Sequence, residues 1–192
     1  NTASALAFKE VLECCKGLAI VLNVIDPVAE HTSKSKAKKI GVIGTKNTIA
    51  SNAYSAKLGE LNKNVTIASL PTPLLVPMIE EGFYNDKIST SIISNYLENK
   101  VLENIDHLIL GCTHYPLIED EINNYYENKV VIVNSAKIVS QFIKKRLQEN
   151  KLLASVPSKK SHLFFVSDYT KSFEQSAQYF FGQRISFTEV VL

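Results

Sequence analysis

The stretch from Ile105 to Pro116 reads IDHLILGCTHYP and joins a short apolar run to a group of chemically reactive side chains. Residues 105–110 are mostly apolar, which predicts a buried strand. The run Lys39–Ile43 has the same character and ends in Gly44-Thr45, where a helix is expected to open and continue to about Leu61. Apolar strands that alternate with helices are typical of parallel sheets covered on both faces. The sequence therefore predicts an α/β fold.

The same patterns place further elements along the chain. Additional strands are expected at 18–25, 65–68, 130–133, 163–166 and 185–191. Additional helices are expected at 3–16, 28–36, 86–102, 136–149 and 170–181, with one helix from about 117 and a short one that ends at 80–82. The polar, proline-bearing segment Lys151–Ser161 is the expected linker.

The composition describes a nearly neutral chain that can build a packed core. It has 192 residues, of which 45% are hydrophobic, and 21 Lys and Arg against 19 Asp and Glu give a net charge of +2. These values exclude disordered, collagen-like and coiled-coil chains. The basic run Ser33–Lys39 lacks interleaved aromatic residues, and no apolar run approaches the roughly 18 residues of a membrane span. The expected partner is a small molecule, with no nucleic acid and no membrane.

The three cysteines favour the reducing environment of a cytoplasm. Cys14 and Cys15 are adjacent and therefore poorly placed to bridge each other. Cys112 is then the cysteine that lies beside other reactive side chains. The chain has no phosphate-binding loop and no dinucleotide-binding glycine motif, so no nucleotide cofactor is expected. No metal site is expected either, because metal-ligand spacing is absent around His31, His107 and His162.

Cys112 and His114 form the first candidate site. They lie two residues apart just after a predicted strand, so an extended loop would point both side chains toward the cleft above the sheet, where ligands bind in parallel α/β folds. A histidine beside a thiol can exchange protons with it, as a catalytic thiolate requires. The alternative is a buried, inert cysteine beside a capping histidine.

Two further sets of polar residues flank predicted helices. Thr45 and Thr48 follow Gly44 at a strand-to-helix turn, where hydroxyls and free N–H groups can hold a carboxylate; the alternative is that Thr45 is only a helix N-cap. Glu80 and Glu81 close a short helix, where a negative charge opposes the helix dipole. One of the two is a candidate partner for His114, and solvated surface is the alternative.

The octapeptide GCTHYPLI at 111–118 resembles the glutamate racemases of the cofactor-independent aspartate/glutamate racemase superfamily. The resemblance continues along nearly the whole chain and in the same order. It includes NTASA at 1–5, NVIDP at 23–27, IGVIGT at 40–45, SNAY at 51–54 and VPMIEEG at 76–82.

The resemblance implies an isomerase that interconverts L- and D-glutamate without a cofactor, in the cytoplasm, to supply peptidoglycan synthesis. Two cysteines on opposite faces of the α-carbon would act, one as thiolate and the other as thiol. The implied catalytic residues are Cys112, His114 and Glu80. The implied substrate-binding residues are Asn1, Thr2, Thr45, Thr48, Thr113 and His114.

The resemblance also implies a domain arrangement. It consists of two doubly wound parallel-sheet domains, one of them built from both ends of the chain. The expected ranges are 1–26 for an N-terminal part of this composite domain, 27–133 for the middle domain and 134–192 for the C-terminal part. The other catalytic cysteine of the family stands directly before the position of Asn1. We therefore expect an N-terminally truncated racemase whose first domain is incomplete, with little racemase activity in the 192 residues alone.

Several alternatives remain open at this point. Within the superfamily, the substrate would be aspartate or another amino acid. Outside enzymes, the chain would be a fragment that serves as a binding or assembly module. A cysteine hydrolase is less favoured, because no Asn or Asp is placed to orient His114 in a recognisable triad. A homodimer is one candidate assembly.

Overall fold

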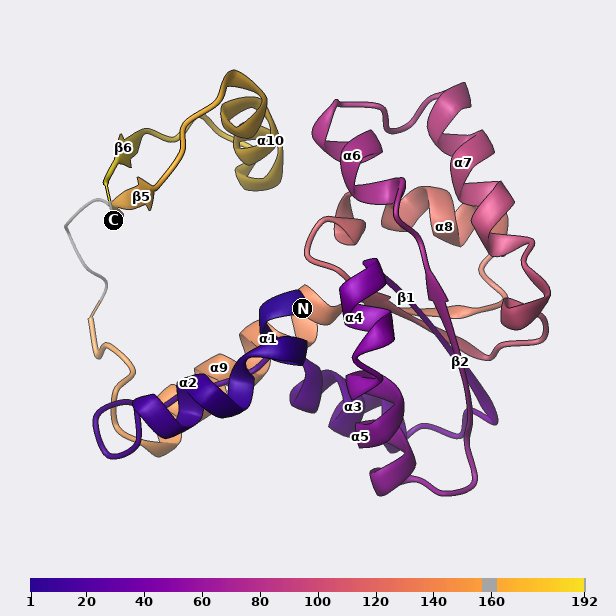
Figure 1. The fold of residues 1–192 in the computed structure, drawn as a ribbon, viewed down its shortest axis with the longest axis horizontal. Coiled ribbons are helices and arrows are strands. Elements are labelled where there is room, and N and C mark those ends of the chain that lie inside the picture. Colours follow the sequence, from indigo (N-terminus) through magenta and orange to yellow (C-terminus); the bar gives the residue numbers. More distant parts are fainter. Residues whose placement is uncertain (157–161, 192) are drawn as a thin grey trace.

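A computed structural model describes residues 1–156 and 162–191. Its centre is a four-stranded parallel sheet with the order β2-β1-β3-β4 (Figure 1). The strands are β1 (Lys39–Gly44), β2 (Thr66–Pro71), β3 (His107–Gly111) and β4 (Val131–Val133). The two central strands, β1 and β3, are almost entirely buried, as their apolar sequences require. The predicted parallel α/β sheet is confirmed.

Helices cover both faces of this sheet (Figure 1). One face packs against α6 (Leu75–Glu80), α7 (Lys87–Leu97) and α8 (Glu119–Tyr125). The other face packs against α3 (Ile25–Ser33), α5 (Ala53–Leu61) and α9 (Ser135–Glu149). Within β3, Leu108 and Leu110 belong to the first apolar cluster and Ile109 to the second, because successive side chains of a strand point to opposite faces.

Three neighbouring strands end at the same level. Gly44 of β1 pairs with Pro71 of β2 on one side and with Gly111 of β3 on the other. A Cβ atom at Gly111 would lie 2.7 Å from the carbonyl oxygen of Ile43, so the close approach of β1 and β3 requires glycine here. The residues that follow these strand ends are consequently brought together at one edge of the sheet.

An N-terminal and a C-terminal segment contact this central unit. At the N-terminus, α1 (Thr2–Leu6) contacts α4 (Lys46–Ala50), and α2 (Phe8–Cys14) continues the chain away from it. At the C-terminus, β5 (Phe164–Val166) and β6 (Phe187–Glu189) form a parallel pair connected through α10 (Lys171–Phe181). Figure 1 shows this C-terminal unit next to α6 and apart from α9.

The predicted strand at 18–25 is wrong. Residues 19–23 form an irregular loop, the side chain of Leu18 is 85% exposed, and Ile25 already begins α3. The run has the composition of a strand, but a strand also needs a neighbour for its backbone hydrogen bonds. Among residues 1–156 and 162–191, no strand pairs with this run.

Three predicted helices are interrupted or shortened. The helix at 3–16 is split at Ala7 into α1 and α2. The helix predicted to continue to Leu61 breaks between α4 and α5, where Asn52 adopts a left-handed backbone with φ of 57°. The helix at 86–102 ends at Leu97 and is followed by a 3-10 turn over Lys100–Leu102. Of the predicted linker, residues 157–161 lie outside the described residues.

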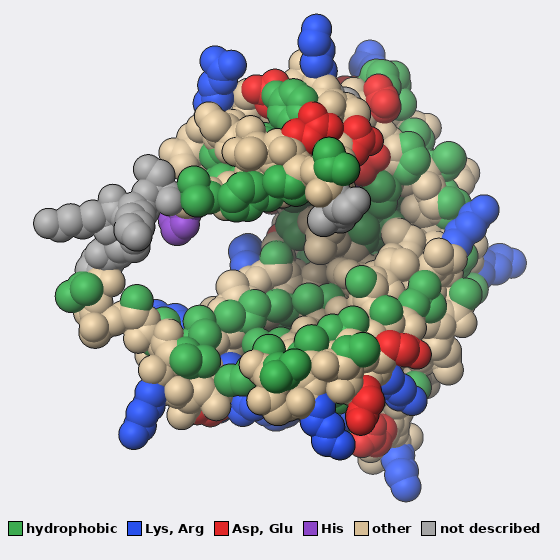
Figure 2. Space-filling model, turned by 60° about the vertical axis from the view of Figure 1, so that its left-hand side comes forward, with side chains coloured by type: hydrophobic (Ala, Val, Ile, Leu, Met, Phe, Trp, Pro, Cys, Tyr) green, Lys and Arg blue, Asp and Glu red, His purple; other side chains and the backbone are tan. Residues whose placement is uncertain are grey.

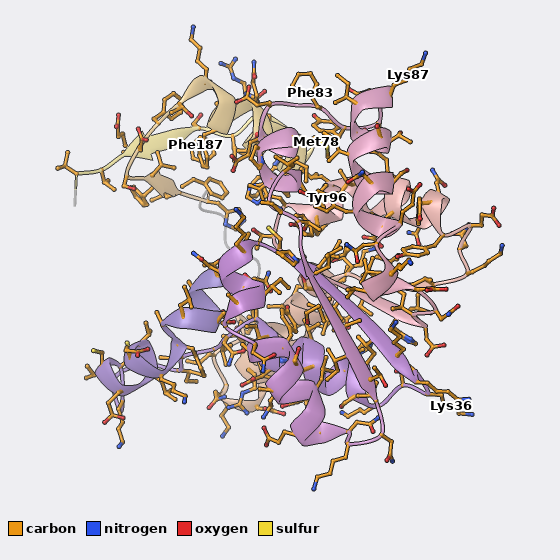
Figure 3. All side chains as sticks on the ribbon, turned by 45° about the vertical axis from the view of Figure 1, so that its right-hand side comes forward. Lys36, Met78, Phe83, Lys87, Tyr96 and Phe187 are labelled. Carbon is orange, nitrogen blue, oxygen red and sulfur yellow. The ribbon has the colours of Figure 1, made fainter. Side chains whose placement is uncertain are left out.

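The structure also shows where the basic run at 33–39 lies. In Figure 3, Lys36 of the basic run lies where the chain enters the sheet, at the opposite end of the strands from Met78 of α6. No helix in the described ranges is both long enough and apolar enough to cross a bilayer.

Candidate active site

Cys112, His114 and Glu80 form a chain of contacts at the carboxyl end of β3. The Sγ atom of Cys112 is 3.7 Å from Nδ1 of His114, and Nε2 of His114 is 3.0 Å from Oε1 of Glu80. Cys112 and His114 follow β3, whereas Glu80 is the last residue of α6. The structure therefore places Glu80, and not Glu81, in contact with His114.

The loop that carries the thiol is a turn and not the extended segment that the sequence suggested. The backbone N–H of Tyr115 donates to the carbonyl of Cys112 at 3.3 Å, and a 3-10 turn over Tyr115–Ile118 follows. In this turn the side chains of Cys112 and His114 still reach each other. The spacing of two residues thus brings the pair together through a different backbone conformation from the one expected.

The contact with Glu80 determines how His114 faces the thiol. A carboxylate only accepts hydrogen bonds, so the Nε2 atom of His114 carries the proton that points to Glu80. In a neutral imidazole, Nδ1 is then an acceptor directed at the Sγ–H of Cys112. The ring of Phe180 from α10 packs edge-on against His114, with the ring centroids 6.0 Å apart. The arrangement suits proton transfer from the thiol to the imidazole.

The thiol of Cys112 is largely buried. It is 6% exposed, and this burial raises its pKa above the ordinary thiol value. The charge of Glu80 acts in the same direction, while the backbone N–H groups of His114 and Thr113 act against it. Cys112 is therefore held as a thiol at neutral pH, with His114 beside it to accept the proton.

Three threonine hydroxyls meet at the end of the neighbouring strand. The Oγ1 atoms of Thr2, Thr45 and Thr48 lie 3.0 to 3.2 Å from one another. Thr45 is also the N-cap of α4, because its Oγ1 accepts a hydrogen bond from the backbone N–H of Thr48. Thr45 thus caps a helix and belongs to a polar cluster, while its role in holding a carboxylate stays a prediction.

Asn1 is held in this region by a tyrosine. The hydroxyl of Tyr54 in α5 donates to Oδ1 of Asn1 at 2.6 Å. The ring of Tyr54 packs on the backbone at Gly111, directly before Cys112. Burial raises the pKa of Tyr54, and the charge of an ionised Cys112 would raise it further. Tyr54 therefore connects Asn1 with the thiol loop and remains a neutral hydrogen-bond donor.

A cavity of about 960 Å³ opens on the other side of His114. Glu80, Thr113 and His114 line one wall of it, and side chains of the C-terminal unit line the other. Most of the latter are apolar, and several phenylalanines among them are exposed: Phe165, Phe173, Phe180 and Phe181. In Figure 2, hydrophobic side chains gather on both sides of a deep hollow. The four residues Asn1, Thr2, Thr45 and Thr48 are not among the described lining residues.

A family model described as Asp/Glu/hydantoin racemase matches residues 20–143. The chain belongs to this family. The match includes Thr45, Thr48, Glu80 and the whole Cys112–His114 turn.

Relatives in the Asp/Glu/hydantoin racemase family cover most of the chain. The glutamate racemase of Chlorobaculum parvum is 34% identical over 192 residues, which is 100% of this chain and 70% of that protein. The glutamate racemase of Sulfurihydrogenibium sp. is 39% identical over 168 residues, 85% of this chain and 64% of that protein. The chain thus spans about two thirds of the length of these relatives.

Solved structures of glutamate racemases share the fold. The enzyme of Francisella tularensis, crystallised with D-glutamate, has a TM-score of 0.90 and 33% identity; the alignment covers 100% of this chain and 70% of that one. Isoform RacE1 of Bacillus anthracis has a TM-score of 0.88 and 36% identity; the alignment covers 100% of this chain and 71% of that one. The expected fold class is confirmed, and the alternative of an aspartate racemase is not favoured.

In this racemase family member, the structure also identifies polar residues that the sequence analysis did not select. They are Tyr54, which holds Asn1, and the buried pair of Thr72 and Tyr115. Tyr54 and Tyr115 lie within motifs that carry the resemblance, SNAY and GCTHYPLI, but no local pattern assigns them a partner. Within the described residues no group of three His, Cys, Asp or Glu side chains is placed to hold a metal ion.

Proposed function

We propose that this chain carries the glutamate-racemising site of its gene product and that Cys112 exchanges the α-proton of glutamate. The observation that carries the proposal is the chain of contacts from Cys112 through His114 to Glu80, with 3.7 Å between Sγ and Nδ1. Such a chain of contacts supplies a thiol with a proton acceptor and supplies that acceptor with a carboxylate. It stands at the carboxyl end of a parallel strand, where ligands bind in this class of fold.

In the proposed reaction, the thiol proton of Cys112 moves to Nδ1 of His114, and the resulting thiolate removes the proton on the α-carbon of glutamate. The imidazolium is stabilised by the carboxylate of Glu80. The proton of an α-carbon is weakly acidic, so its removal needs a strong base. The burial that raises the pKa of Cys112 also makes its thiolate a stronger base than an exposed one.

Inversion further requires a proton donor on the opposite face of the α-carbon. The family resemblance assigns this role to a cysteine directly before Asn1. Asn1 lies close to the thiol loop, because its side chain is bonded to Tyr54, whose ring packs on Gly111. A cysteine in that position would therefore stand across the site from Cys112. Its thiol would return a proton to the carbanion while Cys112 retains the one removed.

The polar groups around the thiol suit an amino acid with two carboxylates. The hydroxyls of Thr2, Thr45 and Thr48, the amide of Asn1 and the side chain of Thr113 are hydrogen-bond donors at the edge of the sheet. We propose that they bind the α- and γ-carboxylates of glutamate. The mutual bonds among the threonines would then be exchanged for bonds to substrate oxygens.

This proposal includes the expected domain ranges. Cys112, His114, Glu80, Thr45 and Thr48 fall within the range 27–133, and the four strands of the main sheet fall within it as well. Asn1, Thr2 and the Phe180 contact come from the ranges 1–26 and 134–192. The site would thus lie between a middle domain and a composite domain. The D-glutamate formed would supply peptidoglycan synthesis in the cytoplasm.

The test is racemisation of L-glutamate by the gene product that carries this chain, followed by chiral chromatography. Replacement Cys112→Ala should abolish formation of D-glutamate, while Cys14→Ala, an exposed cysteine remote from the site, should leave it unchanged. Parallel assays with L-aspartate examine the alternative substrate. Turnover that survives Cys112→Ala, or turnover of aspartate without turnover of glutamate, would contradict the proposal.

A further inference from the structure

Three strand ends in register are followed by three loops that build the candidate site. The end of β1 at Gly44 leads to Thr45, and the end of β3 at Gly111 leads to Cys112. The end of β2 leads to Thr72 and then to α6, whose last residue is Glu80. Each loop thus supplies one part of the site, so its geometry depends on how the three loops are held relative to one another.

One buried pair of hydroxyls connects all three loops. The Oη atom of Tyr115 lies 2.6 Å from Oγ1 of Thr72, and both residues are 0% exposed. The hydroxyl of Thr72 in turn donates to the carbonyl oxygen of Gly44 at 3.3 Å, and the backbone N–H of Thr72 donates to the same oxygen at 2.9 Å. The hydroxyl of Tyr115 is also 3.3 Å from the carbonyl oxygen of Thr72, so either hydroxyl can be the donor in the bond between them.

The two hydroxyls are thus bonded to each other, and Thr72 also connects them to the carbonyl of Gly44. Tyr115 directly follows His114, and Gly44 directly precedes Thr45. The carbonyl of Thr72 also accepts from the backbone N–H of Leu75 at 3.2 Å, at the first residue of α6. Thr72 is consequently in contact with the beginning or end of every loop that supplies the site.

Apolar packing alone does not explain these two residues. Tyr115 lies in the apolar cluster formed with α6 and β3, where a phenylalanine ring would fill the same volume. Valine has nearly the shape of threonine. Burying hydroxyls costs free energy unless they are bonded, and in return a bonded pair fixes direction and distance as apolar contacts do not.

We propose that Thr72 and Tyr115 are positioning residues that hold the Cys112–His114 turn, the Thr45 turn and the start of α6 at the spacing required for the reaction. The reaction itself rests on the function proposed above, whereas the positioning of the Cys112 thiol does not. Neither residue is placed in contact with substrate. They act through the three loops that they join.

The test measures the environment of the Cys112 thiol directly. In the 192-residue chain with Cys14→Ser and Cys15→Ser, Cys112 is the remaining thiol, and its rate of alkylation by iodoacetamide is measured against pH. The variants are Tyr115→Phe, Thr72→Val and Thr72→Ser, with thermal unfolding recorded for each. The matched control is Thr32→Val, which also removes a buried hydroxyl, bonded to the carbonyl of Val28 within α3, away from the site.

Tyr115→Phe and Thr72→Val should loosen the turn and expose the thiol. Alkylation at pH 8 should become several-fold faster, and its midpoint should move to lower pH, because burial is what raises the pKa of Cys112. Thr72→Ser, which keeps the hydroxyl, should restore the parent profile. The double variant should show no more than the larger single effect, because both changes remove the same hydrogen bond.

The proposal is overturned if Tyr115→Phe and Thr72→Val lower the unfolding temperature as Thr32→Val does but leave the alkylation profile unchanged. It is also overturned if Thr72→Ser fails to restore the profile. In the gene product, the same two variants should lower kcat/KM for glutamate by about tenfold to a hundredfold. A shifted alkylation profile of the 192-residue chain, combined with a gene product that does not turn over glutamate, would support the positioning role and reject the proposed function.

Discussion

The Nε2 atom of His114 lies 3.0 Å from Oε1 of Glu80, while Nδ1 of the same ring faces the thiol of Cys112. This contact orients the imidazole and places a negative charge near the thiol. Glu80→Gln removes the charge and keeps a side chain of the same size. Because the charge of Glu80 contributes to the raised pKa of Cys112, the substitution should move the midpoint of Cys112 alkylation to lower pH.

The same substitution should reduce the turnover of glutamate, because a neutral amide stabilises the imidazolium less than a carboxylate does. We expect a loss of roughly tenfold to a thousandfold in kcat, the range for a removed acid–base or electrostatic contribution. Glu81→Gln is the matched control, since this neighbouring carboxylate is not the one that contacts His114. Equal effects of the two substitutions, or a midpoint that rises with Glu80→Gln, would be incompatible with the assigned contact.

The folded environment of Cys112 predicts a specific pH dependence. Alkylation requires the thiolate, so the midpoint of the rate against pH should lie above about 8.5, the ordinary thiol value, and should return to it in denaturant. In linkage terms, the folded chain holds this proton more tightly than the unfolded chain. The stability contributed by the thiol is therefore present below the ordinary pKa and is lost as pH rises through the raised one. A midpoint at or below the ordinary value in the folded chain would contradict the buried setting.

The close approach of β1 and β3 predicts that Gly111 does not tolerate a side chain. A Cβ atom there would lie 2.7 Å from the carbonyl oxygen of Ile43. This oxygen belongs to the backbone of β1 and cannot move away as a flexible side chain could. Gly111→Ala should lower the free energy of unfolding by about 1–3 kcal/mol, as for other overpacked sites, measured by urea denaturation. Gly59→Ala in α5 is the control, since the space around Gly59 is open, and it should stabilise by about 0.5–1 kcal/mol. Equal stability of the two variants would count against the structure at this point.

Loss of the Tyr54 hydroxyl should affect the position of Asn1. Tyr54→Phe removes the hydroxyl that donates to Oδ1 of Asn1 at 2.6 Å and should lower the free energy of unfolding by about 0.5–1.5 kcal/mol. The control is Tyr126→Phe, because the buried hydroxyl of Tyr126 has no hydrogen-bond partner in the part of the chain that is described. That change should be neutral or stabilising. In the gene product, Tyr54→Phe should also raise KM for glutamate, whereas Tyr126→Phe should not.

The central sheet is predictable from sequence because each of its strands can be recognised from its own residues. In β1 and β3, apolar residues fill the strand and a glycine ends it. The run at 18–25 has a similar composition and is not a strand, because pairing depends on a neighbour elsewhere in the chain. Composition therefore shows which segments could form strands, but it does not show which of them find a partner strand, and the unpaired run leaves Leu18 and Ile20 exposed.

The sequence predicts only those parts of the site whose residues lie close together along the chain. The spacing of Cys112 and His114 places them together in an extended loop or in the turn that the structure has. The sequence leaves Glu80 and Glu81 as alternatives, since the choice depends on the end of α6 meeting the turn after β3. Tyr54 and Thr72 look like ordinary core residues until the fold brings them to Asn1 and Tyr115.

Cys112 is proposed to move the α-proton of glutamate, and isotope exchange follows this proton directly. L-glutamate and D-glutamate are incubated separately in D₂O with the gene product that carries this chain, and the α-proton signal is followed by NMR. The signal of both enantiomers should be lost with the parent and with Cys14→Ala, whereas with Cys112→Ala the signal of the enantiomer that Cys112 deprotonates should persist. Undiminished exchange of both enantiomers in the Cys112→Ala variant would show that Cys112 does not move this proton.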